Sequence, residues 1–488
     1  MFGKDKCTVV VLAGLLLLIS TGQMVSAVFA TRSMNLGTNK HFLRADGKWI
    51  ADDAGNRILL RGANFFGYEY GLWDLHGEQD FKKMASWGFN VVRLPIAWNF
   101  IEPEPGNYDE TYFTNYVDRD LAWAKQYGLY VILDMHQYGW SPRFTYYDDW
   151  HTAGLPSWSV SGYPNTSMGE AQARADFWSN LGPNGAVPSA SNPSMQDRFI
   201  QMWKFVASRY ADEDTIAGFD LFNEPSTFSM GGNSLYGGDP YWNGINMFCA
   251  QVLPQFYERL VDAVRTTDNS HLIIWEPAAI YHTTTLPPNR PGVVFSPHYP
   301  TAGIYSWAYN CEVPYYNGSR ACLEKVADTL STMSQEWNQP IFVGEWGMLA
   351  TDVNVREFVA DLSDILDGHF IGSAWWSYGR SSFGMNLLDV TGAERTALTQ
   401  PLIRPYPAVS SMPTSYSIFD TDAKELRVGV TGPSVLWIYL PASSHPLQVK
   451  VDGADVSWRR PVITQTIIRN IVIVFVPSGG SEMLVSLR

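Results

Sequence analysis

Short apolar runs recur between residues 58 and 376, and segments with apolar residues at helical spacing separate them. Each run is continuously apolar rather than alternating, which is typical of strands that are buried on both faces of a parallel sheet. Eight such strands that alternate with helices predict an α/β fold of the (β/α)8 TIM-barrel type. The predicted strands are Ile58–Asn64, Asn90–Ile96, Tyr130–His136, Ile216–Pro225, His271–Pro277, Val293–Tyr299, Pro340–Trp346 and Phe370–Trp376.

Two connections between the runs are much longer than a link requires: Gln137–Asn192 and Thr301–Arg320. Both are rich in aromatic residues, so we expect them to wall two sides of a cleft. The alternative is that about half of these rings pack against the barrel. The segments predicted as helices are Asp80–Gly88, Tyr112–Gly128, Gln196–Ala211, Asn246–Thr266, Leu323–Trp337 and Val355–Leu366.

The pattern changes after about residue 400, where short β-type runs alternate with Gly, Pro, Ser and Asp. We therefore predict a barrel domain over residues 31–400, with a small N-terminal hairpin at His41–Arg57, and a C-terminal β-sandwich over residues 401–488. The predicted sandwich strands are Val435–Leu440, Leu447–Val451, Ile463–Ile468, Asn470–Val476 and Met483–Leu487.

Residues 1–30 have the pattern of a secretory signal peptide. Lys4 and Lys6 precede the apolar run Val9–Ile19, and small residues end the segment at Val25–Ala27 or Val28–Ala30. We expect this leader to be cleaved and the protein to be secreted. An uncleaved membrane anchor is the alternative.

The composition is that of a globular protein with a large core, since 46% of the residues are hydrophobic and 17% are charged. The net charge of −14 argues against a nucleic-acid partner, because phosphate-binding surfaces need an excess of cations. Aromatic residues make up 14% of the chain, more than a core usually needs, and such rings can stack on sugars or acyl chains. Cys311 and Cys322 could close a disulfide in an oxidising compartment, which would leave Cys249 single and buried.

Polar and aromatic residues end the predicted strands, and the carboxyl ends of barrel strands meet at one face. Two of these residues are glutamates, because Glu224 follows the run I-A-G-F-D-L-F-N and Glu345 follows P-I-F-V-G. A lone glutamate at a strand end is more often part of a structural ion pair, but two of them across one barrel mouth suit hydrolysis of a glycosidic bond. Glu224 would be the acid/base and Glu345 the nucleophile. Arg93, at the end of the second strand, is the cation that would keep Glu345 ionised.

Five segments taken together resemble glycoside hydrolase family 5. They are R-L-P-I at Arg93, D-M-H-Q at His136, F-N-E-P at Glu224, S-P-H-Y at His298 and V-G-E-W at Glu345. Within that family the chain is most similar to the endoglycoceramidases, through R-Y-A-D-E-D-T-I-A-G-F-D-L-F-N-E-P and the tail segment W-I-Y-L-P. The resemblance implies a retaining β-glycosidase with a barrel followed by a β-sandwich, and a substrate in which an oligosaccharide is joined to ceramide.

The resemblance also implies roles for individual residues. Asn223 would bond the 2-hydroxyl of the sugar, and His136 and His298 would line the sugar site beside the cleaved bond. The floor of that site would be Trp376, with Trp375 as the alternative.

Two positions depart from the endoglycoceramidase pattern. Tyr138 stands where those enzymes have Asp, which leaves the sugar preference open. Tyr299 directly follows His298, so either Tyr299 or Tyr305 would hydrogen-bond the nucleophile.

We predict a secreted retaining β-glycosidase that needs neither a metal nor a cofactor and acts as a monomer on a glycolipid such as a glycosylceramide. We also expect peripheral contact with membrane lipid. The alternatives are an endo-β-glucanase or mannanase of the same family and a carbohydrate-binding protein that has lost catalysis. Glu276, at the end of the fifth strand, is expected to be a structural partner rather than a substrate contact.

Overall fold

The computed structural model describes residues 41–137, 139–147, 153–235, 246–279, 285–298, 316, 319–441, 446–459, 470–477 and 481–487. The predicted signal peptide, Tyr138, Tyr299 and Tyr305 therefore lie outside the described residues. Most of the second long connection, Thr301–Arg320, lies outside them as well.

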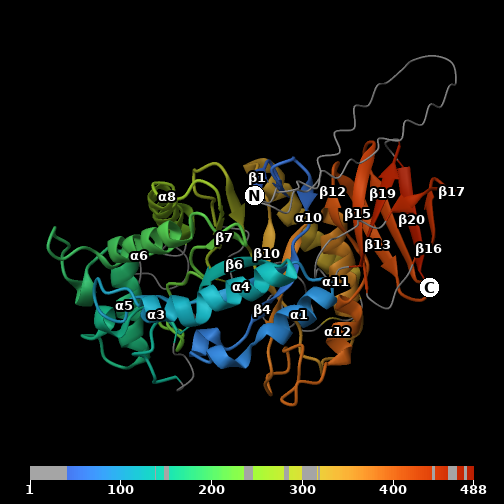
Figure 1. Cartoon of the computed structure of the whole chain (residues 1–488). Helices are drawn as coiled ribbons and strands as arrows, with labels where there is room; N and C mark the ends of the chain where they lie inside the picture. The colour runs from blue at the N-terminus through green and yellow to red at the C-terminus, as the bar shows by residue number, and fades with distance from the viewer. Residues whose placement is uncertain are drawn as a thin grey trace, which may run out of the picture. The chain divides into compact units, whose positions relative to one another are not determined.

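Eight parallel strands form the central barrel and confirm the predicted (β/α)8 fold (Figure 1). Neighbouring strands pair in the order β10-β11-β4-β5-β6-β7-β8-β9. A parallel bridge between Phe295 and Ile341 joins β9 to the start of β10, so the sheet nearly closes on itself. The strands are β4 Arg61–Phe65, β5 Val91–Ile96, β6 Tyr130–Met135, β7 Ile216–Asp220, β8 Leu272–Trp275, β9 Val293–Phe295, β10 Phe342–Trp346 and β11 Gly372–Tyr378.

Helices follow most of the strands and surround the barrel (Figure 1). All six predicted helical segments are helical, and two of them begin with a π-helical turn. These six are α1 Glu78–Ser86, η3 Phe113–Val117 with α4 Asp118–Tyr127, α6 Met195–Tyr210, η6 Phe248–Val252 with α8 Leu253–Val264, α10 Arg320–Trp337 and α11 Val355–His369. Further helices that the sequence did not predict are α2 Trp98–Ile101, α3 Glu110–Tyr112, α5 Ser167–Trp178 and α12 Thr396–Leu402, with 3-10 turns η1 Tyr68–Tyr70, η2 Trp73–Leu75, η4 Ser157–Val160 and η5 Pro183–Gly185.

The long connection after β6 contains α5 and packs largely against the barrel. Trp140, Phe177 and Trp178 are buried, and all three rings contact the Phe222 ring just beyond β7. These three rings therefore pack against the barrel, which was the alternative to their lining a cleft. Tyr147, by contrast, is 57% exposed.

The first predicted run divides between two sheets, which corrects its boundaries. Arg57–Ile58 forms β3 and pairs antiparallel with β12 Tyr406–Ser410, whereas β4 begins at Arg61. The predicted N-terminal hairpin is present as β1 Arg44–Asp46 and β2 Trp49–Ala51, and β2 pairs with β3. The amino-terminal strands thus belong to a sheet of the C-terminal region.

Two antiparallel sheets form that C-terminal region, as expected for a sandwich. One has the order β1-β2-β3-β12-β15-β19-β18 and the other β13-β14-β20-β16-β17. Buried Leu, Ile, Val and Met side chains of both sheets form one core between them. The remaining strands are β13 Thr414–Asp420, β14 Glu425–Val430, β15 Ser434–Leu440, β16 Pro446–Val451, β17 Ala454–Asp455, β18 Trp458–Arg459, β19 Asn470–Val476 and β20 Ser481–Leu487.

Four of the five predicted sandwich strands are present, and Ile463–Ile468 lies outside the described residues. The division at residue 400 remains a prediction, because residues 40–488 form a single compact unit. Two tyrosines connect the sandwich to the C-terminal end of α1 and the loop after it. Tyr439 donates to the carbonyl of Ser86, the last residue of α1, at 3.0 Å, and Tyr406 donates to the Gly88 carbonyl at 2.7 Å. Gly88 must be glycine here, because a Cβ atom would lie 2.1 Å from the Tyr439 ring.

The cysteines agree with the sequence interpretation as far as the structure describes them. Cys322 is disulfide-bonded, and Cys311 lies outside the described residues. Cys249 is buried as a thiol in η6.

Candidate active site

Seven of the predicted site residues lie in barrel strands or just after them, toward the carboxyl ends where this fold holds its active sites. Arg93, Glu345 and Trp376 belong to β5, β10 and β11. The other residues follow the last residue of β6, β7 or β9 within a few positions: His136, Asn223, Glu224 and His298.

Arg93 forms the centre of the site and is fully buried. Its guanidinium contacts three buried carboxylates, with Nη2 2.8 Å from Asp134, Nε 3.0 Å from Asp220 and Nη2 2.7 Å from Glu276. Burial alone would lower the pKa of Arg93, but the surrounding carboxylates outweigh it and raise this pKa well above the ordinary value. Arg93 therefore stays cationic.

The same guanidinium reaches the outer residues of the site. Nη1 donates to Glu345 Oε1 at 2.9 Å, and Nη2 donates to Asn223 Oδ1 at 3.0 Å. The predicted contact between Arg93 and Glu345 is thus present. The Asn223 Nδ2 atom is buried and has no hydrogen-bond partner among the described residues, so it is available to a ligand.

The predicted effect of Arg93 on Glu345 is only partly correct. Burial raises the pKa of Glu345 above the ordinary value of 4.5, and the Glu224 charge raises it further, although His298 and Arg93 act in the opposite direction. Arg93 does lower this pKa, as we expected, but burial is the largest influence and outweighs it.

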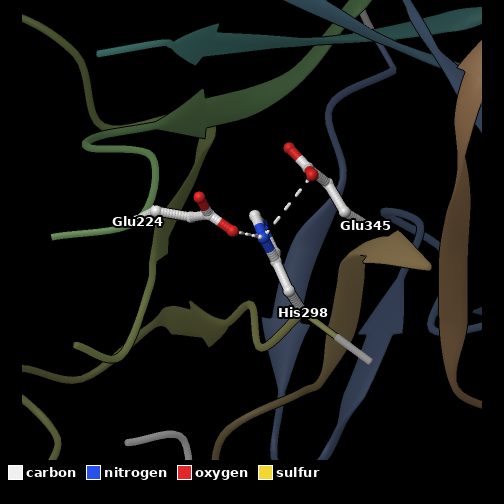
Figure 2. A group of neighbouring side chains, drawn as sticks. All are labelled: Glu224, His298 and Glu345. Atoms are coloured by element: carbon white, nitrogen blue, oxygen red, sulfur yellow. Dashed lines mark hydrogen bonds and ion pairs between the residues drawn. The ribbon is translucent and has the colours of Figure 1, made fainter. Parts of the chain in front are cut away.

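His298 lies between the two predicted catalytic glutamates, as Figure 2 shows. Its Nδ1 is 2.9 Å from Glu224 Oε1 and 3.6 Å from Glu345 Oε2. One carboxylate oxygen of each glutamate and one ring nitrogen of His298 lie within 4.8 Å of one another. Burial opposes a charged ring, but Glu276, Glu345 and Glu224 raise the pKa of His298 well above its usual range. The ring therefore carries a proton that it can donate to Glu224.

Gly344 leaves the space that the His298 ring occupies. A Cβ atom at this position would lie 2.7 Å from Ser296 Oγ and 3.2 Å from His298 Nε2. The residue before Glu345 must therefore be glycine for His298 to reach both glutamates.

Glu276 lies behind the two glutamates, consistent with the expected structural partner. In addition to the Arg93 contact, its Oε2 accepts the backbone N–H of Glu224 at 2.7 Å, and its Oε1 is 3.2 Å from His298 Nε2. Glu276 is only 1% exposed.

His136 and Trp376 form the other side of the site. Their rings stack with centroids 5.6 Å apart and planes at 10°. Trp376 is partly exposed, whereas Trp375 is buried, donates to the Met385 carbonyl and packs on Trp346, so the geometry favours Trp376 as the ring available to a ligand.

Asp134 holds the His136 ring through Nδ1 at 2.8 Å. Burial would lower the pKa of His136, but the charges of Asp134, Glu345 and Glu69 outweigh it and raise this pKa to about 9. His136 therefore adds a second cationic imidazole to the site.

Glu69 is a site residue that the sequence analysis missed. It lies in η1, just after β4, and is 3% exposed, with Oε2 accepting the Gly67 N–H at 2.9 Å. Burial raises its pKa to about 7, and it interacts electrostatically with both His136 and Glu345. The available signal was a Tyr-Glu-Tyr segment between two glycines directly after a barrel strand.

Two groups of side chains have atoms of the kind that ligate metals: Glu224, His298 and Glu345, and Asp134, Asp220 and Glu276. Arg93 forms an ion pair with each carboxylate of the second group. In the first group, the two carboxylates lie beside the His298 ring.

Residues 51–382 match the family model described as cellulase, glycosyl hydrolase family 5. The chain belongs to glycosyl hydrolase family 5. This family assignment agrees with the predicted resemblance, and the family 5 match covers all eight barrel strands.

Three comparisons describe how this family 5 chain relates to known proteins. Endoglycoceramidase I of Rhodococcus hoagii (strain 103S) is 24% identical over 460 residues, which cover 85% of this chain and 83% of that protein. Endoglucanase C of Acetivibrio thermocellus (strain ATCC 27405) is 21% identical over 364 residues, which cover 67% of this chain and 89% of that protein. The structure of endo-glycoceramidase II from Rhodococcus sp. in complex with ganglioside GM3 has a TM-score of 0.67 at 22% identity and covers 90% of this chain and 99% of that chain. The protein is thus a family 5 glycoside hydrolase related to endoglycoceramidases.

Proposed function

We propose that the protein is a retaining β-glycosidase in which Glu345 is the nucleophile and Glu224 is the acid/base. Glu345 attacks the anomeric carbon while Glu224 gives its proton to the departing oxygen, and Glu224 then takes a proton from the water that releases the sugar. The observation that carries this proposal is the approach of the two carboxylates to within 4.8 Å. Retaining enzymes hold these groups about 5–5.5 Å apart, whereas inverting enzymes leave about 6.5–9.5 Å for a water molecule.

The surrounding residues support a sugar site beside this pair. The unpaired Asn223 amide can donate to the 2-hydroxyl, and Trp376 offers a ring face on which a sugar can stack. Because burial raises the pKa of Glu345, we predict that the acidic limb of the kcat/KM profile lies above pH 4.5. A limb at or below the ordinary glutamate value would contradict the nucleophile assignment.

Stereochemistry tests the mechanism directly. Proton NMR during hydrolysis of an aryl β-glycoside should show the β-anomer of the sugar first, followed by mutarotation. Initial release of the α-anomer would contradict the proposal. In Glu224→Ala, added azide should restore turnover of a dinitrophenyl glycoside and yield a β-glycosyl azide, because a small anion can replace the water that needs the base.

The substrate that we propose is a glycolipid in which a sugar is β-linked to a ceramide-type lipid. The likeness to endoglycoceramidase I over most of both chains supports this choice. The alternative is a β-glucan, which the endoglucanase relative favours. A panel of glycosphingolipids, steryl glucosides, cellulose and mannan, with products identified by mass, distinguishes them. We expect free oligosaccharide plus ceramide, and release from soluble glucans alone would overturn the choice.

Peripheral contact with a lipid surface belongs to the same proposal. Most of the exposed large apolar side chains among the described residues lie on segments that follow barrel strands in the sequence and precede the next barrel helix or strand. They are Leu72, Tyr147, Met168, Val187, Leu235, Met247, Leu286, Leu349, Val353, Phe383 and Val390.

Flotation with phosphatidylcholine vesicles tests this contact. We expect the protein to float with the vesicles, and Val353→Asp with Val390→Asp to weaken the association. Because the net charge is −14, vesicles with added phosphatidylserine should bind the protein less well. Equal flotation of the wild type and the double variant would contradict a contact through these side chains.

Secretion through a cleaved leader is also a proposal, and it rests on the pattern of residues 1–30. Among the described residues, no helix is long and apolar enough to cross a membrane. Amino-terminal sequencing of protein from the culture medium should begin at Val28 or Thr31. Protein that stays with the membrane fraction and keeps its first residues would favour the anchor instead.

A further inference from the structure

Glu276 takes no part in the chemistry proposed above, yet it contacts three residues of the site. Its Oε2 accepts the Glu224 backbone N–H at 2.7 Å, and its Oε1 accepts from Arg93 at 2.7 Å and lies 3.2 Å from His298 Nε2. We propose that Glu276 is a positioning residue that holds the acid/base glutamate and its histidine partner in the geometry of proton transfer. This inference rests on the proposed role of Glu224 as acid/base.

The backbone of Glu224 needs such a support. Its φ of +46° lies in the left-handed region, which costs a residue with a side chain about 1–2 kcal/mol. A hydrogen bond from an N–H to a carboxylate is stronger than one to a neutral acceptor, so the Glu276 contact can stabilise this conformation. The neighbouring backbone is held on both sides, by Asn223 N–H to the Met135 carbonyl and by Ala279 N–H to the Pro225 carbonyl.

The second contact of Glu276 determines how His298 meets Glu224. The His298 ring lies between the carboxyl groups of Glu276 and Glu224, with Nε2 toward Glu276 and Nδ1 toward Glu224. Nε2 and Glu276 are within ion-pair distance but lack hydrogen-bond geometry, so Glu276 acts on the ring through its charge, which favours the protonated imidazole. Nδ1 then presents its proton to Glu224 Oε1 at 2.9 Å.

The third contact of Glu276, with Arg93, allows a competing interpretation. Arg93 donates to Glu276 through Nη2 and to the nucleophile Glu345 through Nη1, so Glu276 could instead act through the nucleophile. The two routes differ in one measurable respect. Acid assistance matters for a poor leaving group and hardly matters for a good one, whereas the nucleophile is needed for both.

The experiment compares Glu276→Gln with the wild type on two β-glycosides of one sugar that the wild type cleaves, one with a 2,4-dinitrophenyl and one with an alkyl leaving group. If Glu276 acts through Glu224, kcat/KM should fall about 10–100-fold on the alkyl glycoside and less than about 3-fold on the dinitrophenyl glycoside. An equal loss on both substrates would overturn the proposal.

Asp220→Asn is the matched control. Asp220 bonds Arg93 Nε at 3.0 Å, and among the described contacts it makes none to Glu224 or His298. Asp220→Asn should therefore lower kcat/KM by the same factor on the alkyl and the dinitrophenyl glycoside. A leaving-group dependence as large as that of Glu276→Gln would also overturn the proposal, because a general disturbance around Arg93 would then explain the effect.

A second variant covers the case in which Glu276→Gln does not fold. Glu276→Asp keeps the charge but shortens the side chain by one methylene, and the same selective loss on the alkyl glycoside is expected. Failure of this inference is distinguishable from failure of the proposed function. If Glu224 is not the acid/base, Glu224→Gln itself shows no dependence on the leaving group, whatever Glu276→Gln does.

Discussion

The site contains two sets of acidic residues that lie close together and differ in one property, their access to solvent. The inner set, Asp134, Asp220 and Glu276, has side chains that are 0%, 0% and 2% exposed. The outer pair, Glu224 and Glu345, has side chains that are 28% and 15% exposed. Both sets depend on Arg93, which bonds all three inner carboxylates and Glu345.

The comparison teaches that the inner charges are structural and the outer charges are available for reaction. A buried carboxylate is tolerated only when it is paired, and the guanidinium provides up to five N–H donors for this purpose. The outer carboxylates keep part of their surface open to a ligand while Arg93 and His298 hold them from behind. Substitutions in the two sets should therefore affect different observables.

The largest expected effect is on activity, from neutralising the outer set. Glu345→Gln should lower kcat about 10⁴-fold or more, because the amide cannot form the glycosyl-enzyme intermediate. Its melting temperature should stay within about 4 °C of the wild type, since the Arg93 cluster behind it is intact. Turnover of an aryl β-glycoside and thermal unfolding measure the two quantities.

Glu357→Gln is the control for this variant, because Glu357 is an exposed residue of α11. Glu357→Gln should change neither the turnover of the aryl β-glycoside nor the melting temperature. Near-wild-type turnover by Glu345→Gln would remove the nucleophile assignment and, with it, the distinction between the two sets.

The next effect is on stability, from removing the cation that the inner set shares. Arg93→Met leaves buried carboxylates unpaired and should cost at least about 3–5 kcal/mol of unfolding free energy. Arg93→Lys keeps the charge but has three donors instead of a planar fork, so it should lose less unfolding free energy than Arg93→Met. Urea unfolding at neutral pH measures the unfolding free energy of both variants. A Met variant as stable as the wild type would show that the inner carboxylates are protonated and need no cation.

The sequence predicted the eight barrel strands and the ring of residues at their ends, because both are local patterns with a fixed relation to the fold. It missed the division of Ile58–Asn64, because the partner of β3 is β12, whose residues lie about 350 positions later. Tertiary pairing with a distant strand has no local signal. The strands β12 Tyr406–Ser410, β13 and β14 were missed as well, because their apolar patterns are short.

The candidate site shows the same limit. Each motif identified one or two residues, but no motif showed that Arg93 is shared by Asp134, Asp220, Glu276 and Glu345. Nor did any motif show that burial and the Glu224 charge raise the pKa of Glu345 despite the bond from Arg93. Glu69 was missed because it comes from an irregular turn, where its burial depends on packing of the whole barrel mouth.

The smallest of the three effects concerns Glu69, a buried carboxyl group whose pKa is raised more by burial than it is lowered by the nearby His136 charge. It is as buried as the inner set, and its Oε2 accepts the Gly67 N–H. Its pKa rises from 4.5 to about 7 on folding, mainly through burial. The unfolded chain therefore releases this proton at lower pH than the folded protein, so folding stability falls as the pH rises from about 4.5 to about 7. Above pH 7 the full penalty, about 3 kcal/mol, is present.

Glu69→Gln cannot ionise, so it should remove this penalty. We expect the variant to be more stable than the wild type by up to about 3 kcal/mol at pH 8 and to differ little at pH 4.5. Urea unfolding at the two pH values measures this, with the exposed Glu104→Gln as a control that should match the wild type at both. If Glu69→Gln is instead less stable than the wild type at pH 8, the His136 charge outweighs burial and stabilises the ionised form of Glu69.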